Sequence, residues 1–174
     1  MKTRLRHFTL LLLVALGATG CSVQKFYSLN GAALDYNVYK TISFGEFPIR
    51  AALVYPPLQQ FFENKLMDMA TQQTRLRMVD NVNSDLRMEG EITTYSLSPQ
   101  AVGDNAYATR TRLTIAVRVR YTDNRNPALC NDFTVSAYRD FDASQMLTDV
   151  QDDLCNQIST ELADLIFNQT LGNW

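Results

Sequence analysis

The sequence predicts an α+β domain in which two helices pack on one face of a mostly antiparallel four-stranded sheet. Three observations predict it: strict apolar–polar alternation over residues 109–121, two segments with apolar residues at three- and four-residue spacing, and turn-forming residues between segments. The expected order is β-α-β-β-β-α. Because each helix has one apolar stripe and the sheet one apolar face, both helices are expected on that face, with the opposite face open.

The first strand is expected over residues 40–47, which are rich in β-branched and aromatic side chains and end at Pro48. Pro56 and Pro57 suit the first turn of a helix, which is expected to run to about Thr74. Its predicted apolar face consists of Leu58, Phe61, Phe62, Leu66, Met69 and Ala70.

Residues 76–79 and 86–98, joined by residues 81–84 (NVNS), supply the next strand material, and residues 109–121 form the clearest strand. Period-two alternation places one set of its side chains in the core: Thr111, Leu113, Ile115, Val117, Val119 and Tyr121. The other set is Arg110, Arg112, Thr114, Ala116, Arg118 and Arg120. Residues 123–127 (DNRNP) predict a turn, and residues 130–138 the last strand.

The second helix is expected over residues 144–169 and to end at Gly172. Ser144 or Thr148 is expected to cap it, because Gln151 follows Thr148 by three residues as in a capping box. Early acidic residues suit the helix dipole: Asp149, Asp152 and Asp153. The predicted buried stripe is Val150, Leu154, Ile158, Leu162, Leu165 and Ile166.

Residues 1–20 have the features of a secretory signal peptide: Lys2, Arg4 and Arg6 precede a short apolar run that ends in small residues. Residues 18–21 (ATGC) resemble a lipobox, so we expect cleavage before Cys21 and attachment of palmitate-type acyl chains there. Residues 21–30 would then be a lipidated tether and residues 31–174 one domain. Ser22 and Val23 follow Cys21, where an inner-membrane retention signal of the enterobacterial kind has Asp, so we expect the outer membrane, on its periplasmic side.

Removal of residues 1–20 takes away three basic residues, which leaves 13 Lys and Arg against 18 Asp and Glu and a formal net charge of −5. This balance argues against general nucleic-acid binding. His7 is the single histidine and is lost with the signal, which excludes histidine-dependent catalysis and histidine-ligated zinc in the mature chain. No cofactor or metal is expected, and without a catalytic constellation we expect a non-enzymatic protein.

The arginine row on the expected open face is the candidate binding feature. Arg118 and Arg120 are expected near acidic neighbours, Glu89 beside Arg118 and Asp132 beside Arg120, which allows a simple salt-bridged surface. Arg110 and Arg112 are expected beside the uncharged residues 95 and 97. They are therefore the better candidates for an anionic ligand, because arginine makes bidentate contacts to phosphate.

Cys130 and Cys155 remain in the mature chain, and an oxidising periplasm permits a disulfide. A strand advances about 3.3 Å per residue and a helix about 1.5 Å, so a helix returning over the last strand would place Cys155 over its middle. A disulfide and two free thiols both stay open. The loop at residues 99–107 and Trp174 are open to either a structural or a partner-binding role.

Several segments in order resemble the LptE-type lipopolysaccharide-assembly lipoproteins. They are the lipobox with residues 26–31 (FYSLNG), 53–57 (LVYPP), 78–80 (MVD), 86–92 (LRMEGEI), 95–99 (YSLSP), 112–121, 141–145 (FDASQ), 166–168 (IFN) and 173–174 (NW). The resemblance covers nearly the whole mature chain.

This resemblance implies two helices against a four-stranded sheet. It also implies a plug inside the β-barrel translocon LptD, at the inner leaflet of the outer membrane, that helps lipopolysaccharide reach the outer leaflet. Family members bind lipopolysaccharide through basic residues of the exposed sheet region; the choice of Arg110, Arg112, Arg118 and Arg120 here is our inference from the residues. One alternative is an accessory or ligand-binding lipoprotein of an envelope lipid transporter, which would use the helix–sheet cleft. Another is a purely structural envelope lipoprotein.

Overall fold

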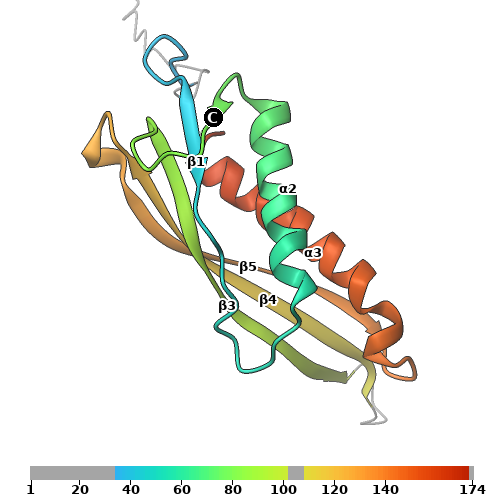
Figure 1. The fold of residues 1–174 in the computed structure, drawn as a ribbon. Coiled ribbons are helices and arrows are strands. Elements are labelled where there is room, and N and C mark those ends of the chain that lie inside the picture. The colour runs from blue at the N-terminus through green and yellow to red at the C-terminus, as the bar shows by residue number, and fades with distance from the viewer. Residues whose placement is uncertain (1–33, 102–107, 173–174) are drawn as a thin grey trace, which may run out of the picture.

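The structure is a computed structural model that describes residues 34–101 and 108–172 (Figure 1). The predicted signal peptide, the tether with Cys21 and Trp174 lie outside these residues. The elements, in chain order, are β1 (Thr41–Phe44), α2 (Pro57–Gln73), β2 (Arg77–Met78), β3 (Leu86–Ala101), β4 (Ala108–Asp123), the 3-10 helix η1 (Pro127–Leu129), β5 (Asn131–Asp142) and α3 (Leu147–Thr170).

The α+β class is confirmed, but the prediction of four mostly antiparallel strands is wrong: among the described residues the sheet has five strands and is mixed. The strand order is β2-β1-β3-β4-β5. β1 runs parallel to both β2 and β3, whereas β3, β4 and β5 are antiparallel. The difference arises at Arg77–Met78, which pairs with β1 on the edge away from β3 because α2 crosses over and returns the chain parallel to β1.

β1 ends at Phe44, earlier than predicted, but the chain continues beside β3. The Gly45 N–H donates to the Met88 carbonyl at 2.7 Å, and the Ile92 N–H donates to the Pro48 carbonyl at 3.0 Å. This close approach explains Gly90, where a Cβ atom would lie 2.1 Å from the Arg118 carbonyl oxygen and 2.9 Å from Cε1 of Phe47. Only glycine fits between these neighbours without displacing backbone.

Both helices cover one face of the sheet, as predicted, and the core lies between the two layers (Figure 1). The predicted core face of β4 is confirmed: Leu113, Ile115, Val117 and Val119 are fully buried. α2 buries Leu58, Phe62, Leu66 and Ala70. α3 buries Leu154, Cys155, Ile158, Ser159, Leu162, Ala163, Ile166 and Phe167, whereas Leu165, predicted in its stripe, is 39% exposed.

The predicted cap of the second helix is wrong. α3 begins at Leu147 after Met146, which makes no side-chain capping hydrogen bond. The backbone N–H and the hydroxyl of Ser144 instead donate to Oδ1 of Asp142, at 2.8 and 2.6 Å. Ser144 therefore stabilises the turn after β5 and does not cap α3. Serine side chains near the start of a helix can serve either purpose.

β3 is longer than predicted because it continues through Pro99 to Ala101. β1 pairs with β3 only at Leu86–Met88, so β3 is central at one end of the sheet and an edge strand at the other. Pro99 lies in the edge portion, where its missing N–H does not interrupt a ladder. Of the loop expected at residues 99–107, residues 102–107 lie outside those described.

Candidate functional site

The sheet face away from the helices, here called the open face, carries the four predicted arginines at even-numbered positions of β4. Facing residues come from β3 on one side and β5 on the other. A bulge at Thr93 of β3 shifts the register between Ile92 and Thr94. Beyond it, Tyr95 and Leu97 point to the helix side and Ser96, Ser98 and Gln100 to the open face.

Arg118 and Arg120 belong to a network of ion pairs. Arg120 lies 3.5 Å from Asp132, as expected, and 3.8 Å from Glu89. Arg118 lies 3.8 Å from Asp132, and the residue opposite it on β3 is Glu91. The expected pairing of Arg118 with Glu89 is therefore wrong, because Glu89 lies opposite Arg120. Both arginine side chains are more than half exposed, so each pair contributes about 0–1 kcal/mol.

A groove of about 450 Å³ lies beside this network on the open face. Its lining combines four carboxylates with two guanidinium groups: Glu46, Glu89, Glu91, Asp132, Arg118 and Arg120, together with Pro48 and Gly90. Because carboxylates outnumber arginines, this part of the open face does not favour a phosphate.

Arg112 is held by its neighbours, contrary to the expectation that it would be unpaired. Its guanidinium donates to both oxygens of Asp140, at 2.7 and 2.9 Å, and lies over the Tyr138 ring, 3.7 Å from the centroid. These hydrogen bonds raise the pKa of Arg112 and lower the pKa of Asp140. The bidentate pair and the aromatic support fix the guanidinium plane near the hairpin end of the open face.

Arg110 is exposed and faces Gln100 of β3 and Asp142 of β5. The Asp142 carboxylate accepts two hydrogen bonds from Ser144, which lower its pKa. Within residues 34–101 and 108–172, no ion pair is found for Arg110, although its charge helps to lower the pKa of Asp140 and Asp142. It therefore fits the predicted anion-binding role better than Arg112, Arg118 or Arg120.

The candidate disulfide between Cys130 and Cys155 is absent, and both thiols are free. Cys130 is exposed beside Asp123, whose N–H donates to the sulfur at 3.3 Å. Cys155 is fully buried, and burial raises the pKa of its thiol to about 12. Cys155 lies against Tyr95, which aligns through β4 with Ala137. Ala137 is seven strand residues, or about 23 Å, along the chain from Cys130.

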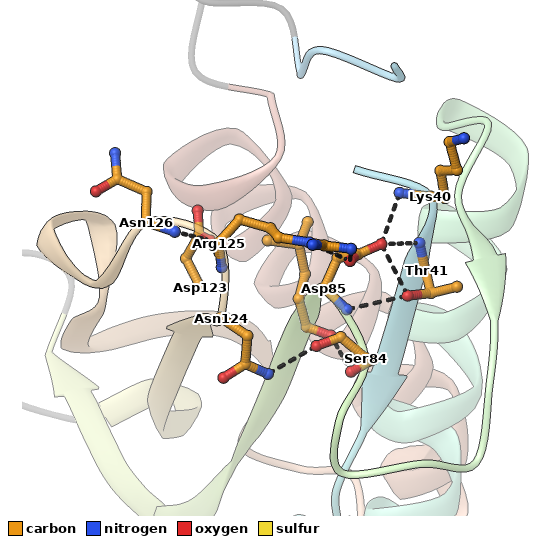
Figure 2. A network of polar contacts seen from close by, with 9 residues as sticks. Lys40, Thr41, Ser84, Asp85, Asp123, Asn124, Arg125 and Asn126 are labelled. Atoms are coloured by element: carbon orange, nitrogen blue, oxygen red, sulfur yellow. Dashed lines mark hydrogen bonds and ion pairs between the residues drawn. The ribbon is translucent and has the colours of Figure 1, made fainter. Parts of the chain in front are cut away.

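A buried polar network at the β1 end of the sheet was not predicted (Figure 2). Asp85 accepts hydrogen bonds from the Lys40 N–H at 2.9 Å, from the N–H and hydroxyl of Thr41 at 3.0 and 2.9 Å, and from Arg125 at 2.6 Å. Burial alone would raise the pKa of Asp85, but these donors bring it down to about 2. Asp123 accepts from Arg125 N–H and the Tyr39 hydroxyl.

This network joins the chain before β1, the start of β3 and the turn after β4. Because its acceptors are engaged within the protein, it serves structure and not ligand binding. Among the described residues, no cluster of His, Cys, Asp and Glu suits a metal ion. No helix in the described part of the chain is long and apolar enough to span a membrane.

These features define a class of protein: a two-layer α+β domain whose charged open face is its candidate binding surface. Two solved structures share this fold. A minor lipoprotein from Acinetobacter baumannii aligns with a TM-score of 0.52 and 17% identity, over 78% of this chain and 95% of that chain. The hypothetical protein CT253 from Chlamydia trachomatis aligns with a TM-score of 0.56 and 10% identity, over 78% and 97%.

The particular family follows from the sequence. The LptE family, described as lipopolysaccharide-assembly, matches residues 39–170, so the chain belongs to this family of non-enzymatic lipoproteins. The predicted resemblance is thereby confirmed. A comparison with curated proteins found no match.

Proposed function

We propose that this protein is a lipid-anchored outer-membrane subunit that plugs an LptD-like β-barrel and assists lipopolysaccharide transport through it. The family match over residues 39–170 is the observation that carries the proposal. The predicted acylation of Cys21 would hold the domain at the periplasmic side of the membrane and raise its effective concentration at the barrel. The open face is lined with charged and polar side chains, which suits contact with a polar lumen.

The lipopolysaccharide contact is assigned to the hairpin end of the open face. Arg110 provides a guanidinium without an ion pair among the described residues, and Arg112 stands beside it on the same face. Alternate residues on one strand face are separated by about 6–7 Å, so a phosphate bound by Arg110 would lie near Arg112, whose guanidinium is already held by Asp140. Arg112, Arg118 and Arg120 take part less than Arg110, because Asp140, Asp132 and Glu89 already compensate their charge.

The alternative, a ligand-binding lipoprotein of a lipid transporter, would need space between the helices and the sheet. Ile115, Ile158 and Leu162 lie there without solvent exposure, so these positions belong to a packed core. The described cavities beside the helices lie at the margins of this core: one of about 270 Å³ between α2 and the β1–β2 edge, and one of about 600 Å³ between the end of α3 and the turn after β4.

The first test is affinity purification of the tagged protein from outer membranes, followed by mass spectrometry. We expect a large β-barrel protein to co-purify and the N-terminal peptide to carry acyl groups on Cys21. Recovery without a barrel protein, or an unmodified Cys21 in a soluble periplasmic protein, would contradict the proposal.

The second test measures binding of purified lipopolysaccharide to charge-reversed variants. Arg110→Glu should weaken binding about tenfold or more, since a hydrogen bond to a charged group contributes about 1.5–3 kcal/mol. Arg75→Glu, at an exposed residue outside the sheet, is the matched control and should bind as the wild type does. Unchanged binding by the double variant Arg110→Glu with Arg112→Glu would remove this face from the proposal while leaving the barrel partnership standing.

A further inference from the structure

The two edges of the sheet differ in length. β2 forms one edge with two residues, whereas β5 forms the other with twelve, Asn131–Asp142. The register of β5 with β4 runs without a shift from Arg110↔Asp142 to Tyr121↔Asn131, and β5 contains no proline. Proteins usually protect long edges by bulges, proline, short strands or charged side chains; β5 has charged side chains at Asp132, Arg139 and Asp140 but no bulge or proline. In the described ranges, no strand pairs with the outer edge of β5.

The hydrogen bonds show which residues of β5 face outward. The Ala143 N–H donates to the Thr109 carbonyl at 3.1 Å, and bonded pairs alternate in an antiparallel ladder, so odd-numbered residues of β5 bond to β4. The even-numbered residues direct their N–H and C=O groups outward. The Arg139 guanidinium donates to the Tyr138 carbonyl at 2.8 Å, which agrees with this alternation. Asp132, Thr134 and Ser136 therefore present N–H and C=O groups that do not bond to β4.

The flank of α3 beside this edge is acidic. Arg139 of β5 donates to Gln157 at 3.2 Å and to Glu161 at 2.5 Å, and Gln157 donates to Asp153 at 2.8 Å. These contacts place one side of α3 next to β5, and Asp164 lies three residues further along the same side. An added strand that runs along β5 as far as residue 139 would pass three carboxylates, of which Arg139 compensates one.

We propose that the outer edge of β5 binds an extended segment of a partner polypeptide with lysine or arginine at alternate positions. Backbone hydrogen bonds to residues 132–136 would provide affinity, and the basic side chains that face α3 would provide selectivity. A second copy of this chain fits less well, because edge-to-edge pairing would bring two acidic α3 flanks together. The inference concerns a surface outside the arginine row and does not rest on the proposed function.

The test uses the full-length protein in a mild detergent and an end-capped, fluorescently labelled peptide that alternates lysine with threonine or valine. Binding is followed by fluorescence anisotropy and the site by amide hydrogen exchange. We expect the exchange of the Thr134 and Ser136 amides to slow at least tenfold when the peptide binds. The same peptide with glutamate in place of lysine should bind at least tenfold more weakly.

Two variants locate the site. Ser136→Pro removes an outward N–H from an exposed edge position and should weaken binding at least tenfold, whereas Ser136→Ala keeps the N–H and should bind normally. If Ser136→Pro fails to fold, a peptide N-methylated at alternate residues tests the same hydrogen bonds. The pair Asp153→Asn and Asp164→Asn should weaken binding of the lysine peptide several-fold, whereas Asp68→Asn on α2 should not.

Absence of binding at millimolar peptide would overturn the proposal. So would equal binding by Ser136→Pro and Ser136→Ala, or protection of β2 amides in place of those of β5. Concentration-dependent self-association that protects Ser136 without peptide would overturn it as well and assign the edge to a second copy of the chain.

Discussion

Replacing Asp85 with asparagine tests the buried network at the β1 end of the sheet. The side chain keeps its shape but loses its charge, and it loses one acceptor for the donors Lys40 N–H, Thr41 and Arg125. Asp85 is 6% exposed, so water does not replace the lost interactions.

The magnitude follows from the pKa of Asp85. Folding lowers the pKa from its ordinary value to about 2, which corresponds to about 2 kcal/mol of stability at neutral pH. Because the folded pKa is the lower one, this contribution is complete above about pH 5 and is lost as the pH falls through about 4 toward about 2. Asp85→Asn should therefore be about 2 kcal/mol less stable at pH 7, with a melting temperature about 5–10 °C lower.

The measurement is guanidinium unfolding, followed by circular dichroism, of wild type and Asp85→Asn from pH 7 to pH 2.5. The stability difference should shrink steadily below pH 4. Asp80→Asn, at an exposed residue of the same connection between β2 and β3, is the control and should change stability by less than about 0.5 kcal/mol. A difference between wild type and Asp85→Asn that stays constant with pH would refute the assignment of the stabilisation to the ionised carboxylate.

Three further predictions concern packing and the thiols. Gly90→Ala should lower the free energy of unfolding by about 3 kcal/mol or prevent folding, because the new Cβ would clash with the Arg118 carbonyl; a loss below 1 kcal/mol in denaturant unfolding would disprove this. A maleimide at pH 7.5 should label the exposed Cys130 in the folded protein and the buried Cys155 only after denaturation. Peptide mass mapping measures the labelling of each cysteine, and equal labelling in the folded protein would show that Cys155 is accessible. Ile158→Ala should cost about 2–5 kcal/mol, measured by thermal or chemical unfolding, while the partly exposed Leu165→Ala should cost less than about 1 kcal/mol; similar losses would contradict the observed face of α3.

The sequence contained enough information for the helices, the alternation of β4 and the helix-covered face. These elements depend on periodicity, which is a local property of 10 to 20 residues. Residues 76–79 were predicted as strand material, but their place as a separate edge strand parallel to β1 was not, because two paired residues carry no periodicity and Arg77–Met78 is defined only by its partner. Pro99 suggested the end of a strand, because proline does not fit inside a paired strand. The sequence does not reveal that this part of β3 is an edge, where proline is tolerated.

The position of the four arginines was predicted, but the residues that lie beside them on the neighbouring strands were not. The four arginines lie on the open face, yet the bulge at Thr93 changes which residues of β3 lie beside them, and a bulge of one residue leaves no signal in composition. Arg112 meets Asp140 across the sheet, 28 residues away in the sequence, and this pairing depends on the register of β5. Asp85 was missed for a similar reason, because its partners at residues 40–41 and 125 are distant along the chain.

The length of the β3–β4 hairpin sets the reach of the molecule. Sixteen residues at about 3.3 Å each give strands of about 50 Å, whereas α2, with 17 residues, is about 25 Å long. The chain enters at the opposite end of the hairpin, where the Tyr39 hydroxyl bonds to Asp123. The hydrocarbon interior of a bilayer is about 30 Å thick. In a domain tethered at the end where the chain enters, the distance along β4 from that end to Arg110 would exceed this thickness. The point of lipid attachment and the anion-binding arginine would then lie at opposite ends of one hairpin.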